Sequence, residues 1–198
     1  MIPLERRILW RMATRLRADA LRNRAALLTA AREVFAEQGL DASLDEIARR
    51  AGVGNATLYR RFPSRRHLIA AVFAGHLTAA VHLADQALEH SDPWAGFVGY
   101  LTRVCELQAT DRGLAELLVT SAFDDDERIA ALRGAARQRA LDVCTRAQRA
   151  GRLRPDFTRH DITLLMMANA GVAQHSNDPQ AWRRQLALVI GGLGTKTF

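Results

Sequence analysis

The chain has 198 residues, 48% of them hydrophobic and 25% charged, which is the composition of a folded globular protein and excludes a disordered or collagen-like one. Residues 1–75 contain 14 arginines and 7 acidic residues, whereas residues 76–198 contain 14 basic and 14 acidic ones, so the net charge of +7 lies in the first part. This asymmetry indicates a nucleic-acid partner for that part of the chain.

Cysteine content and hydropathy bear on the cellular compartment. Cys105 and Cys144 are the only cysteines and lie far from any CxxC spacing, which favours buried thiols in a reducing cytoplasm over a disulfide framework or a zinc site. No apolar run approaches the roughly 20 residues that span a bilayer. The start, MIPLERRILWRMATRLR, has no apolar stretch of signal-peptide length. We therefore expect a cytoplasmic protein with no membrane partner.

Residues 1–19 form an arginine-rich lead-in to the first helix. One interpretation is an arm that reaches DNA phosphates or the minor groove. A second is a disordered tail. A third is an extension due to start-site choice, because translation from Met12 would still give a complete domain. We favour the last two interpretations. The first helix is then predicted over residues 19–38, and it should end in a Schellman motif with Gly39 left-handed and Leu40 after it.

Residues 43–62 are predicted to form a helix-turn-helix. Ser43 and Glu46 have the spacing of a capping box, and apolar residues then recur at helical spacing. Gly52 suits the left-handed position that ends a helix. A second helix is expected over residues 54–61, where it would be the helix that enters the DNA major groove.

The second helix separates apolar from polar side chains. Leu58 and Phe62 are four residues apart and can both face inward. The other faces carry amide, hydroxyl and guanidinium groups, which are the groups that contact base edges and phosphates. A solvated helix with a few arginines is the alternative interpretation. The capping box, the glycine turn and the inward leucine within one short span disfavour it.

Residues 27–73 resemble the DNA-binding domain of the TetR family of transcriptional regulators, through the pieces AAREVFAEQG, SLDEIARRAGV and TLYRRFPSR. The resemblance implies base contacts by Asn55, phosphate contacts by Thr57, Tyr59 and Arg65, and either kind by the arginines between them. The implied DNA-binding set is Ser43, Asn55, Ala56, Thr57, Tyr59, Arg60, Arg61 and Arg65. The chain departs from the family pattern at Gly54, where serine is common, and at Arg65, where lysine is more common. The first change loosens the helix slightly and the second keeps the charge.

Helical periodicity continues through the rest of the chain without strand-type alternation, so we predict an all-α fold with about nine helices. Later helices are expected over residues 64–89, 92–110, 112–122, from the acidic cluster 124–127 to Gly151, and over 159–173 and 178–192. We divide the chain into a DNA-binding domain, residues 1–65, with three helices that include the helix-turn-helix, and a helical ligand-binding and dimerisation domain, residues 66–198.

No constellation of catalytic residues is evident. The motifs GxSxG, GxxxxGK[ST], GxGxxG and HExxH are absent, and the six histidines are scattered. The acidic cluster 124–127 is explained by the positive end of a helix dipole rather than by a metal ion. We therefore expect no enzymatic activity, no cofactor and no metal.

The neutral second part is best explained as a sensor and dimerisation domain, which is also what the family resemblance implies. Polar side chains within apolar stripes, with their apolar neighbours, mark candidate ligand contacts: Trp94, Phe97, Leu101, Val104, Cys105, Gln108, Met166 and Asn169. For any one of these residues, a place in the core with its polar groups hydrogen-bonded is an equally good interpretation. Helices 159–173 and 178–192 carry more apolar surface than one internal face can use. The predicted dimer interface is Ile162, Trp182, Leu186, Val189, Ile190 and Leu193.

We therefore interpret the chain as a homodimeric, TetR-like repressor that a small-molecule effector releases from a palindromic double-stranded DNA operator. A tilt of the helix over residues 64–89 is expected to change the separation of the two recognition helices, which contact half-sites about 34 Å apart. The alternatives are an architectural or non-ligand-responsive DNA-binding protein and, distantly, a helical enzyme.

Overall fold

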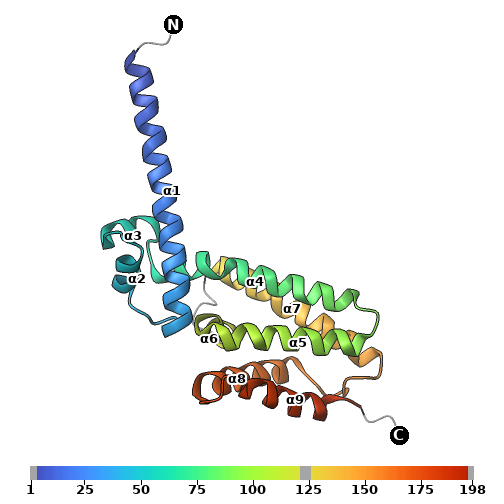
Figure 1. Ribbon diagram of the computed structural model, residues 1–198. Coiled ribbons are helices and arrows are strands. Elements are labelled where there is room, and N and C mark those ends of the chain that lie inside the picture. The colour runs from blue at the N-terminus through green and yellow to red at the C-terminus, as the bar shows by residue number, and fades with distance from the viewer. Residues whose placement is uncertain (1–3, 121–125, 196–198) are drawn as a thin grey trace. The chain divides into compact units, whose positions relative to one another are not determined.

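The computed structural model describes residues 4–120 and 126–195, with side chains from Thr14 onward except that of Leu16. These residues form nine α-helices and no strand, apart from one isolated bridge between Leu153 and Gly194 (Figure 1). The predicted all-α class is confirmed. Contacts divide the chain into two units, Met1–Val34 with Ala42–Val72 and Phe35–Asp41 with Phe73–Phe198.

The first unit contains most of α1 (Leu4–Gln38), all of α2 (Leu44–Arg50) and α3 (Asn55–Arg61), and the start of α4 (Arg65–Glu89). All four helices contribute to its core, through Leu27, Ala31, Val34, Ile47, Ala48, Leu58, Phe62, Leu68 and Ile69. The guanidinium carbon of Arg24 lies 5.6 Å from the centre of the Phe62 ring, which adds a cation–π contact between α1 and the end of α3. The helix-turn-helix therefore rests on α1 and α4.

Helix α1 is longer than predicted. It begins at Leu4 rather than near residue 19, so the segment interpreted as a tail or an extension continues the helix. After Pro3 the sequence contains neither proline nor glycine until Gly39. Once residues 19–38 are helical, nothing in that segment interrupts the backbone hydrogen bonds, and extending a formed helix is easier than nucleating one.

The end of α1 is held by a side chain from a distant helix. Gly39 has the predicted left-handed backbone, with φ +85°, and its N–H donates to the Phe35 carbonyl at 2.9 Å. The N–H of Leu40 does not complete a Schellman motif, because it donates to the Glu116 carboxylate at 2.7 Å. A charged acceptor makes a stronger hydrogen bond than a backbone carbonyl. The prediction is confirmed for Gly39 and wrong for Leu40.

The second unit adds five helices: α5 (Pro93–Thr110), α6 (Arg112–Val119), α7 (Glu127–Arg149), α8 (Arg159–His175) and α9 (Ala181–Leu193). The Asp92 carboxylate caps α5 and accepts from the N–H groups of Trp94 and Ala95 at 2.8 and 3.3 Å, and these bonds lower the pKa of Asp92. Helix α6 ends three residues earlier than predicted. Asp126 caps α7, whereas residues 124 and 125 of the acidic cluster lie outside the described residues.

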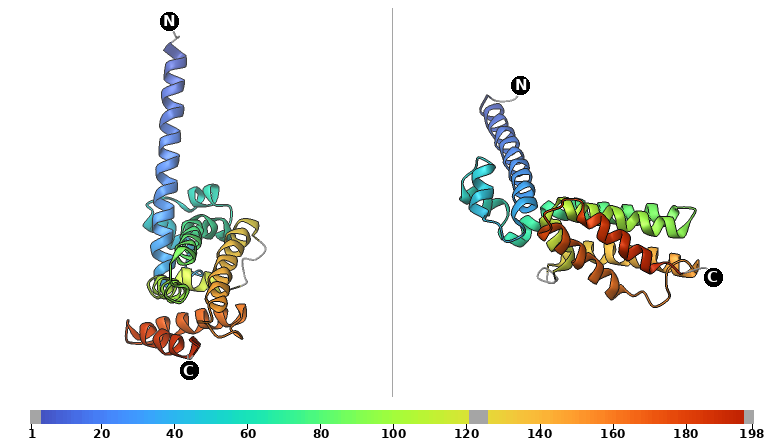
Figure 2. Two further views of the ribbon diagram at one scale, coloured as in Figure 1. Left: turned by 90° about the vertical axis from the view of Figure 1, so that its right-hand side faces the viewer. Right: turned by 60° about the horizontal axis from the view of Figure 1, so that its bottom comes forward.

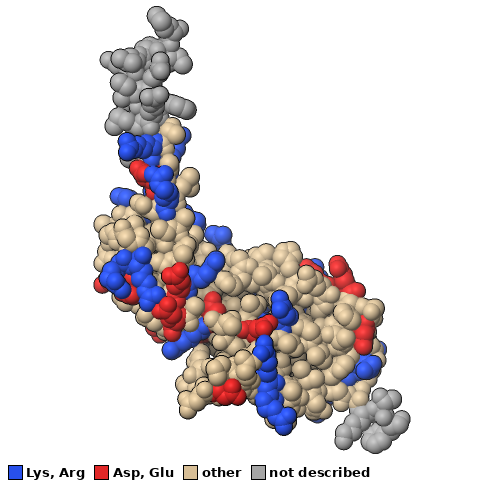
Figure 3. Space-filling model, viewed as in Figure 1, with Lys and Arg blue, Asp and Glu red and all other residues tan. Residues whose placement is uncertain are grey.

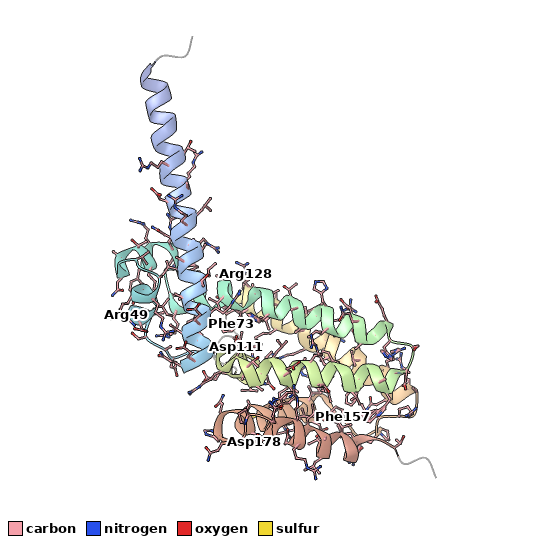
Figure 4. All side chains as sticks on the ribbon, viewed as in Figure 1. Arg49, Phe73, Asp111, Arg128, Phe157 and Asp178 are labelled. Atoms are coloured by element: carbon pink, nitrogen blue, oxygen red, sulfur yellow. The ribbon has the colours of Figure 1, made fainter. Side chains whose placement is uncertain are left out.

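Helix α5 lies at the centre of the second unit, with α4 and α7 on one side and α8 and α9 on the other (Figures 1 and 2). Phe97 of α5 is fully buried. Its ring centre lies 5.4 Å from that of Trp94 and 6.0 Å from that of Phe157. Phe157 belongs to the segment that precedes α8 (Figure 4). Aromatic pairs at these distances stabilise a core beyond the area that they bury.

The two cysteines belong to the same core. Cys105 of α5 and Cys144 of α7 are both buried free thiols, as predicted. Burial raises the pKa of each thiol to about 12, so both stay protonated and neutral at physiological pH.

Helix α4 corrects one expectation from composition. By length and hydropathy alone it could cross a membrane, with a mean hydropathy of 1.5 over 18 residues. The expectation that no apolar run is long enough is therefore wrong for this segment. Its large apolar side chains are buried inside the protein, among them Leu68, Ile69, Phe73 and Leu77. This burial is typical of a core helix of a soluble protein.

Candidate nucleic-acid interface and interior cavity

The turn between α2 and α3 has the geometry predicted from its glycine. Gly52 is left-handed, with φ +66°. Its N–H donates to the Arg49 carbonyl at 3.1 Å, and the N–H of Val53 donates to the Ala48 carbonyl at 3.0 Å. This pair of bonds is a Schellman motif, and it fixes the direction in which the chain leaves α2 for α3.

The start of α2 differs from the prediction. Ser43 has the extended backbone of an N-cap residue, but its side chain makes no capping hydrogen bond. The Glu46 carboxylate instead accepts from Arg49 and Arg50, with each N–O distance 2.8 Å. These bonds lower the pKa of Glu46 to about 2. The capping box is wrong because two guanidinium groups one turn ahead engage the carboxylate that was expected to reach Ser43.

Helix α3 presents a polar face to the solvent. Leu58 and Phe62 are 1% and 3% exposed and attach the helix to the core, as predicted. Most of the predicted DNA contacts on this helix are exposed, namely Asn55, Ala56, Tyr59, Arg60 and Arg61, and Thr57 is half-buried. Half of the surface of Tyr59 is exposed, so its hydroxyl can reach a phosphate oxygen.

Two of the predicted contacts are engaged within the protein. The side-chain amide of Asn55 donates to the Asp45 carboxylate of α2 at 2.7 Å, and both groups are exposed. The Arg65 guanidinium donates to the backbone carbonyl of Ala42 at 2.6 Å. The second bond ties the start of α4 to the segment that leads into α2, and it places Arg65 beside the neighbour of Ser43.

Arginine side chains surround the exposed face of the helix-turn-helix. On the face drawn in Figure 3, basic groups lie along α1 and over α2 and α3, with acidic groups among them. Arg49 and Arg50 pair with Glu46, whereas Arg60 and Arg61 extend from the last turn of α3 into solvent. Two exposed guanidinium groups at the end of this helix suit contacts with a phosphate backbone.

A cavity of about 80 Å³ lies among the helices of the second unit. Its walls come from five helices, α4 to α8: Leu77, Ala80, Tyr100, Leu101, Val104, Leu118, Arg133, Ala136, Arg137, Ala140, Ile162, Thr163 and Met166. Most of these side chains are apolar, and the polar ones are a phenol, a hydroxyl and two guanidinium groups. A mainly apolar cavity with a few polar groups is typical of a small-molecule site.

Three of the predicted ligand contacts, Leu101, Val104 and Met166, line this cavity. The remaining five are core residues: Phe97, Cys105, Gln108 and Asn169 are at most 2% exposed, and Trp94 stacks on Phe97. The Asn169 amide donates to the Gln108 side chain at 3.0 Å and to the Cys105 carbonyl at 3.2 Å. These bonds join α8 to α5, which is the structural role that the sequence left open for polar residues in apolar stripes.

The predicted dimer residues lie in the core, at the cavity or partly buried against the core. Trp182, Leu186 and Leu193 are 4%, 3% and 9% exposed and pack in the core of their own chain. Ile162 lines the cavity, and Val189 and Ile190 are partly buried against the same core. The exposed large apolar residues of α8 and α9 are Leu164, Met167 and Leu188. The apolar stripe chosen on α9 is thus the one that the chain's own core uses.

Arg133 is the most deeply buried charged residue among the lining residues that were not predicted as ligand contacts. Helix α7 buries Ile129, Ala136 and Ala140 on one face, and Arg133 occupies the same register, four residues after Ile129 and three before Ala136. Its side chain is 2% exposed. An arginine at a position of the buried face of α7 could have indicated this site. The adjacent Leu132 concealed it, because Leu132 also fits the apolar spacing of the helix.

Comparison with known families and proteins agrees with this geometry. Residues 27–72 match the sequence model of the bacterial regulatory proteins of the tetR family. Residues 92–195, more than half of the chain, match that of the C-terminal domain of SbtR-like transcriptional regulators. The two matches cover the helix-turn-helix and α5 to α9, which include the cavity walls except Leu77 and Ala80 of α4.

Individual relatives are of the same kind. A solved TetR transcription regulatory protein from Mycobacterium vanbaalenii is 32% identical, with 91% of this chain and 99% of that chain covered and a TM-score of 0.55. The HTH-type regulator TtgW of Pseudomonas putida is 34% identical over 118 residues, 58% of this chain and 85% of its own. The repressor LfrR of Mycolicibacterium smegmatis is 42% identical over 89 residues, 44% of each chain.

Proposed function

This chain belongs to the TetR family of bacterial regulatory proteins, and we propose that it is a homodimeric repressor released from a palindromic operator by a small molecule that enters the cavity of the second unit. Like its relatives it is a DNA-binding transcriptional regulator and not an enzyme. TetR-family regulators are soluble proteins, and we place this one in the cytoplasm.

The division of α3 into a buried and an exposed side is the observation that carries the DNA-binding part. Leu58 and Phe62 hold the helix on the core. The opposite side is then free to enter the major groove, where Asn55 exchanges its bond to Asp45 for a base edge. Tyr59, with Thr57, donates to phosphates. Ser43, Ala56, Arg60, Arg61 and Arg65 complete the contact surface.

The exposed apolar residues of α8 and α9 support the homodimer. Leu164, Met167 and Leu188 are 48%, 51% and 62% exposed, and a patch of large apolar side chains marks an interface. The two helices pack against each other (Figure 2). Pairing them with their symmetry mates gives a four-helix bundle with twofold symmetry. Two copies then present two α3 helices to half-sites about one helical turn apart.

The continuity of α4 supports a change in DNA binding when a ligand binds. One continuous helix carries Arg65, a proposed phosphate contact, and Leu77 and Ala80, which line the cavity. A ligand that displaces Leu77 and Ala80 therefore acts on the helix that holds Arg65. A relative with this fold, LfrR, has been solved in complex with proflavine. The change can be no larger than the difference between the ligand's affinities for the two states.

Operator selection from a library of randomised palindromes tests the proposal. We expect one palindrome to be enriched and its affinity to fall steeply with salt, because arginine–phosphate contacts release counterions. Leu188→Glu, designed to leave the helix-turn-helix unchanged, should lose the preference for the full palindrome over a half-site. Enrichment of no sequence, or equal affinity for all sequences, would favour an architectural DNA-binding protein.

A further inference from the structure

The described residues that line the cavity include two arginines. Arg133 and Arg137 both line it, and they are one turn apart on α7. Among the lining residues that the structure describes, none is an aspartate or a glutamate. A cation that enters such a cavity meets two like charges, whereas an anion meets two opposite ones in surroundings where charge interactions are stronger than in water.

Arg133 is the more deeply placed of the two. Its side chain is 2% exposed, whereas Arg137 is exposed at the rim. The Arg133 guanidinium donates to the backbone carbonyl of Thr120, which directly follows α6. The carbonyl end of a helix carries a partial negative charge, and this explains why a guanidinium is stable there. The planar group has five N–H donors, and its fork matches the two oxygens of a carboxylate.

Tyr100 adds a neutral polar group to the same cavity. Burial raises the pKa of its phenol far above the physiological range, so the group stays protonated. It can therefore donate a hydrogen bond to an anion and carries no charge that repels one. The remaining walls, among them Leu101, Val104 and Met166, are apolar.

We propose that this cavity binds a small monocarboxylate with an apolar body, whose carboxylate pairs with Arg133 and whose hydrocarbon part contacts the apolar walls. The inference rests on the proposed function, since it names the chemical class of the effector. The volume of about 80 Å³ limits the ligand, because pockets for drug-sized molecules measure roughly 300–1,000 Å³. Short aliphatic and single-ring aromatic acids fit this limit better than long-chain acids.

Binding of the carboxylate changes the surroundings of α6. It competes with the Thr120 carbonyl for the Arg133 guanidinium. Helix α6 also carries Glu116, which accepts the Leu40 N–H four residues before α2 begins. Release of the end of α6 is therefore the first structural change that we expect when an acid enters.

The test compares acids with their uncharged amides. Hexanoate, benzoate and phenylacetate are titrated against the purified dimer by calorimetry, alongside hexanamide, benzamide and phenylacetamide. At least one acid should bind tighter than its amide by on the order of tenfold to a hundredfold, as expected for hydrogen bonds to a charged group. Arg133→Met should remove this preference, and Arg149→Met, on an exposed residue of the same helix, should keep it.

Operator binding separates this inference from the proposed function. Arg133→Met should bind the selected operator as tightly as the parent, which shows that the variant is folded. Equal binding of acids and amides, no binding of any acid up to millimolar concentration, or an unchanged preference in Arg133→Met would overturn the carboxylate assignment and leave DNA binding in place. A parent protein that selects no operator would overturn the proposed function instead, whatever the acids do.

Discussion

The helix-turn-helix and the cavity differ in how far apart in the chain their determinants lie. The turn depends on Gly52 and on backbone bonds within residues 48–53, and the seat of α3 depends on Leu58 and Phe62, one turn apart. The cavity depends on five helices, and residues as distant as Leu77 and Met166 share its wall. The spacing of neighbouring residues can be read directly from the sequence. Residues from different helices line one cavity only after the helices have packed.

The largest effects are expected from substitutions on α9, where packing decides which apolar residues belong to the core. Leu186→Glu places a charge at a site that is 3% exposed and should lower the free energy of unfolding by more than about 4 kcal/mol. Leu188→Glu changes a residue that is 62% exposed and should leave the fold intact but yield monomers. Thermal unfolding and sedimentation, at equal protein concentration, distinguish the two. A stable Leu186→Glu variant, or a dimeric Leu188→Glu variant, would contradict the assignment of the two faces.

Smaller changes in stability are expected when either of two left-handed glycines is replaced by alanine. At Gly52 an added Cβ meets nothing within 4 Å, so Gly52→Ala should cost only the backbone term, about 1 kcal/mol. At Gly39 an added Cβ would lie 2.4 Å from the Glu116 carboxylate, which also holds the Leu40 N–H. Gly39→Ala should therefore cost roughly 2–4 kcal/mol, because the charged hydrogen bond is lost as well.

Urea unfolding of a double-mutant cycle isolates this distant contribution. In a Glu116→Ala background, the cost of Gly39→Ala should fall to that of Gly52→Ala. An undiminished cost would mean that the strain at Gly39 is entirely local.

The DNA contacts should show effects of about tenfold. Tyr59→Ala removes a phosphate contact and should weaken binding to every sequence by on the order of tenfold. Asn55→Ala should change the preferred base at one position of each half-site, because the side chain contacts a base edge. Titrations of the selected operator and its single-base variants at several salt concentrations measure both. If Tyr59→Ala binds as tightly as the parent at every salt concentration, the contact surface is misassigned.

The smallest effect concerns the local charge cluster at the start of the helix-turn-helix. Hydrogen bonds from Arg49 and Arg50 lower the pKa of Glu46 from 4.5 to about 2 in the folded protein. The ionised carboxylate therefore stabilises the fold above about pH 4.5, and this contribution is lost as the pH falls toward 2. Solvent screens this exposed cluster, so the effect should be small and best seen at low salt.

Unfolding titrations across this pH range test the assignment. In Glu46→Gln the free energy of unfolding should fall less steeply between pH 4.5 and pH 2 than in the parent. Identical slopes in the two proteins would show that Glu46 titrates at its ordinary pKa.

Features set by neighbours in the chain could be predicted from the sequence. The glycine turn and the inward side of α3 depend on residues a few positions apart, and the structure confirms them. The capping box failed although it is local, because Ser43 and the two arginines compete for one carboxylate and spacing alone does not rank them.

Features set by packing could not be predicted in the same way. Trp182, Leu186 and Leu193 share one apolar face of α9, and only the packing of α9 against α5 and α8 shows that the chain's own core uses this face. Arg133 looks like an ordinary charged residue until α6 and α7 place it beside the cavity. Glu116 gives no sign in the sequence that it binds Leu40, 76 residues away.

Operator binding and ligand binding should be coupled within one chain, and reciprocal titration measures this coupling. The affinity for the tightest-binding acid of the series is measured with and without saturating operator, and the affinity for the operator with and without saturating acid. We expect both affinities to fall by the same factor, typically about 5- to 150-fold for coupled sites. Affinities that are unchanged in both pairs of titrations would contradict it and leave the second unit as a dimerisation module alone.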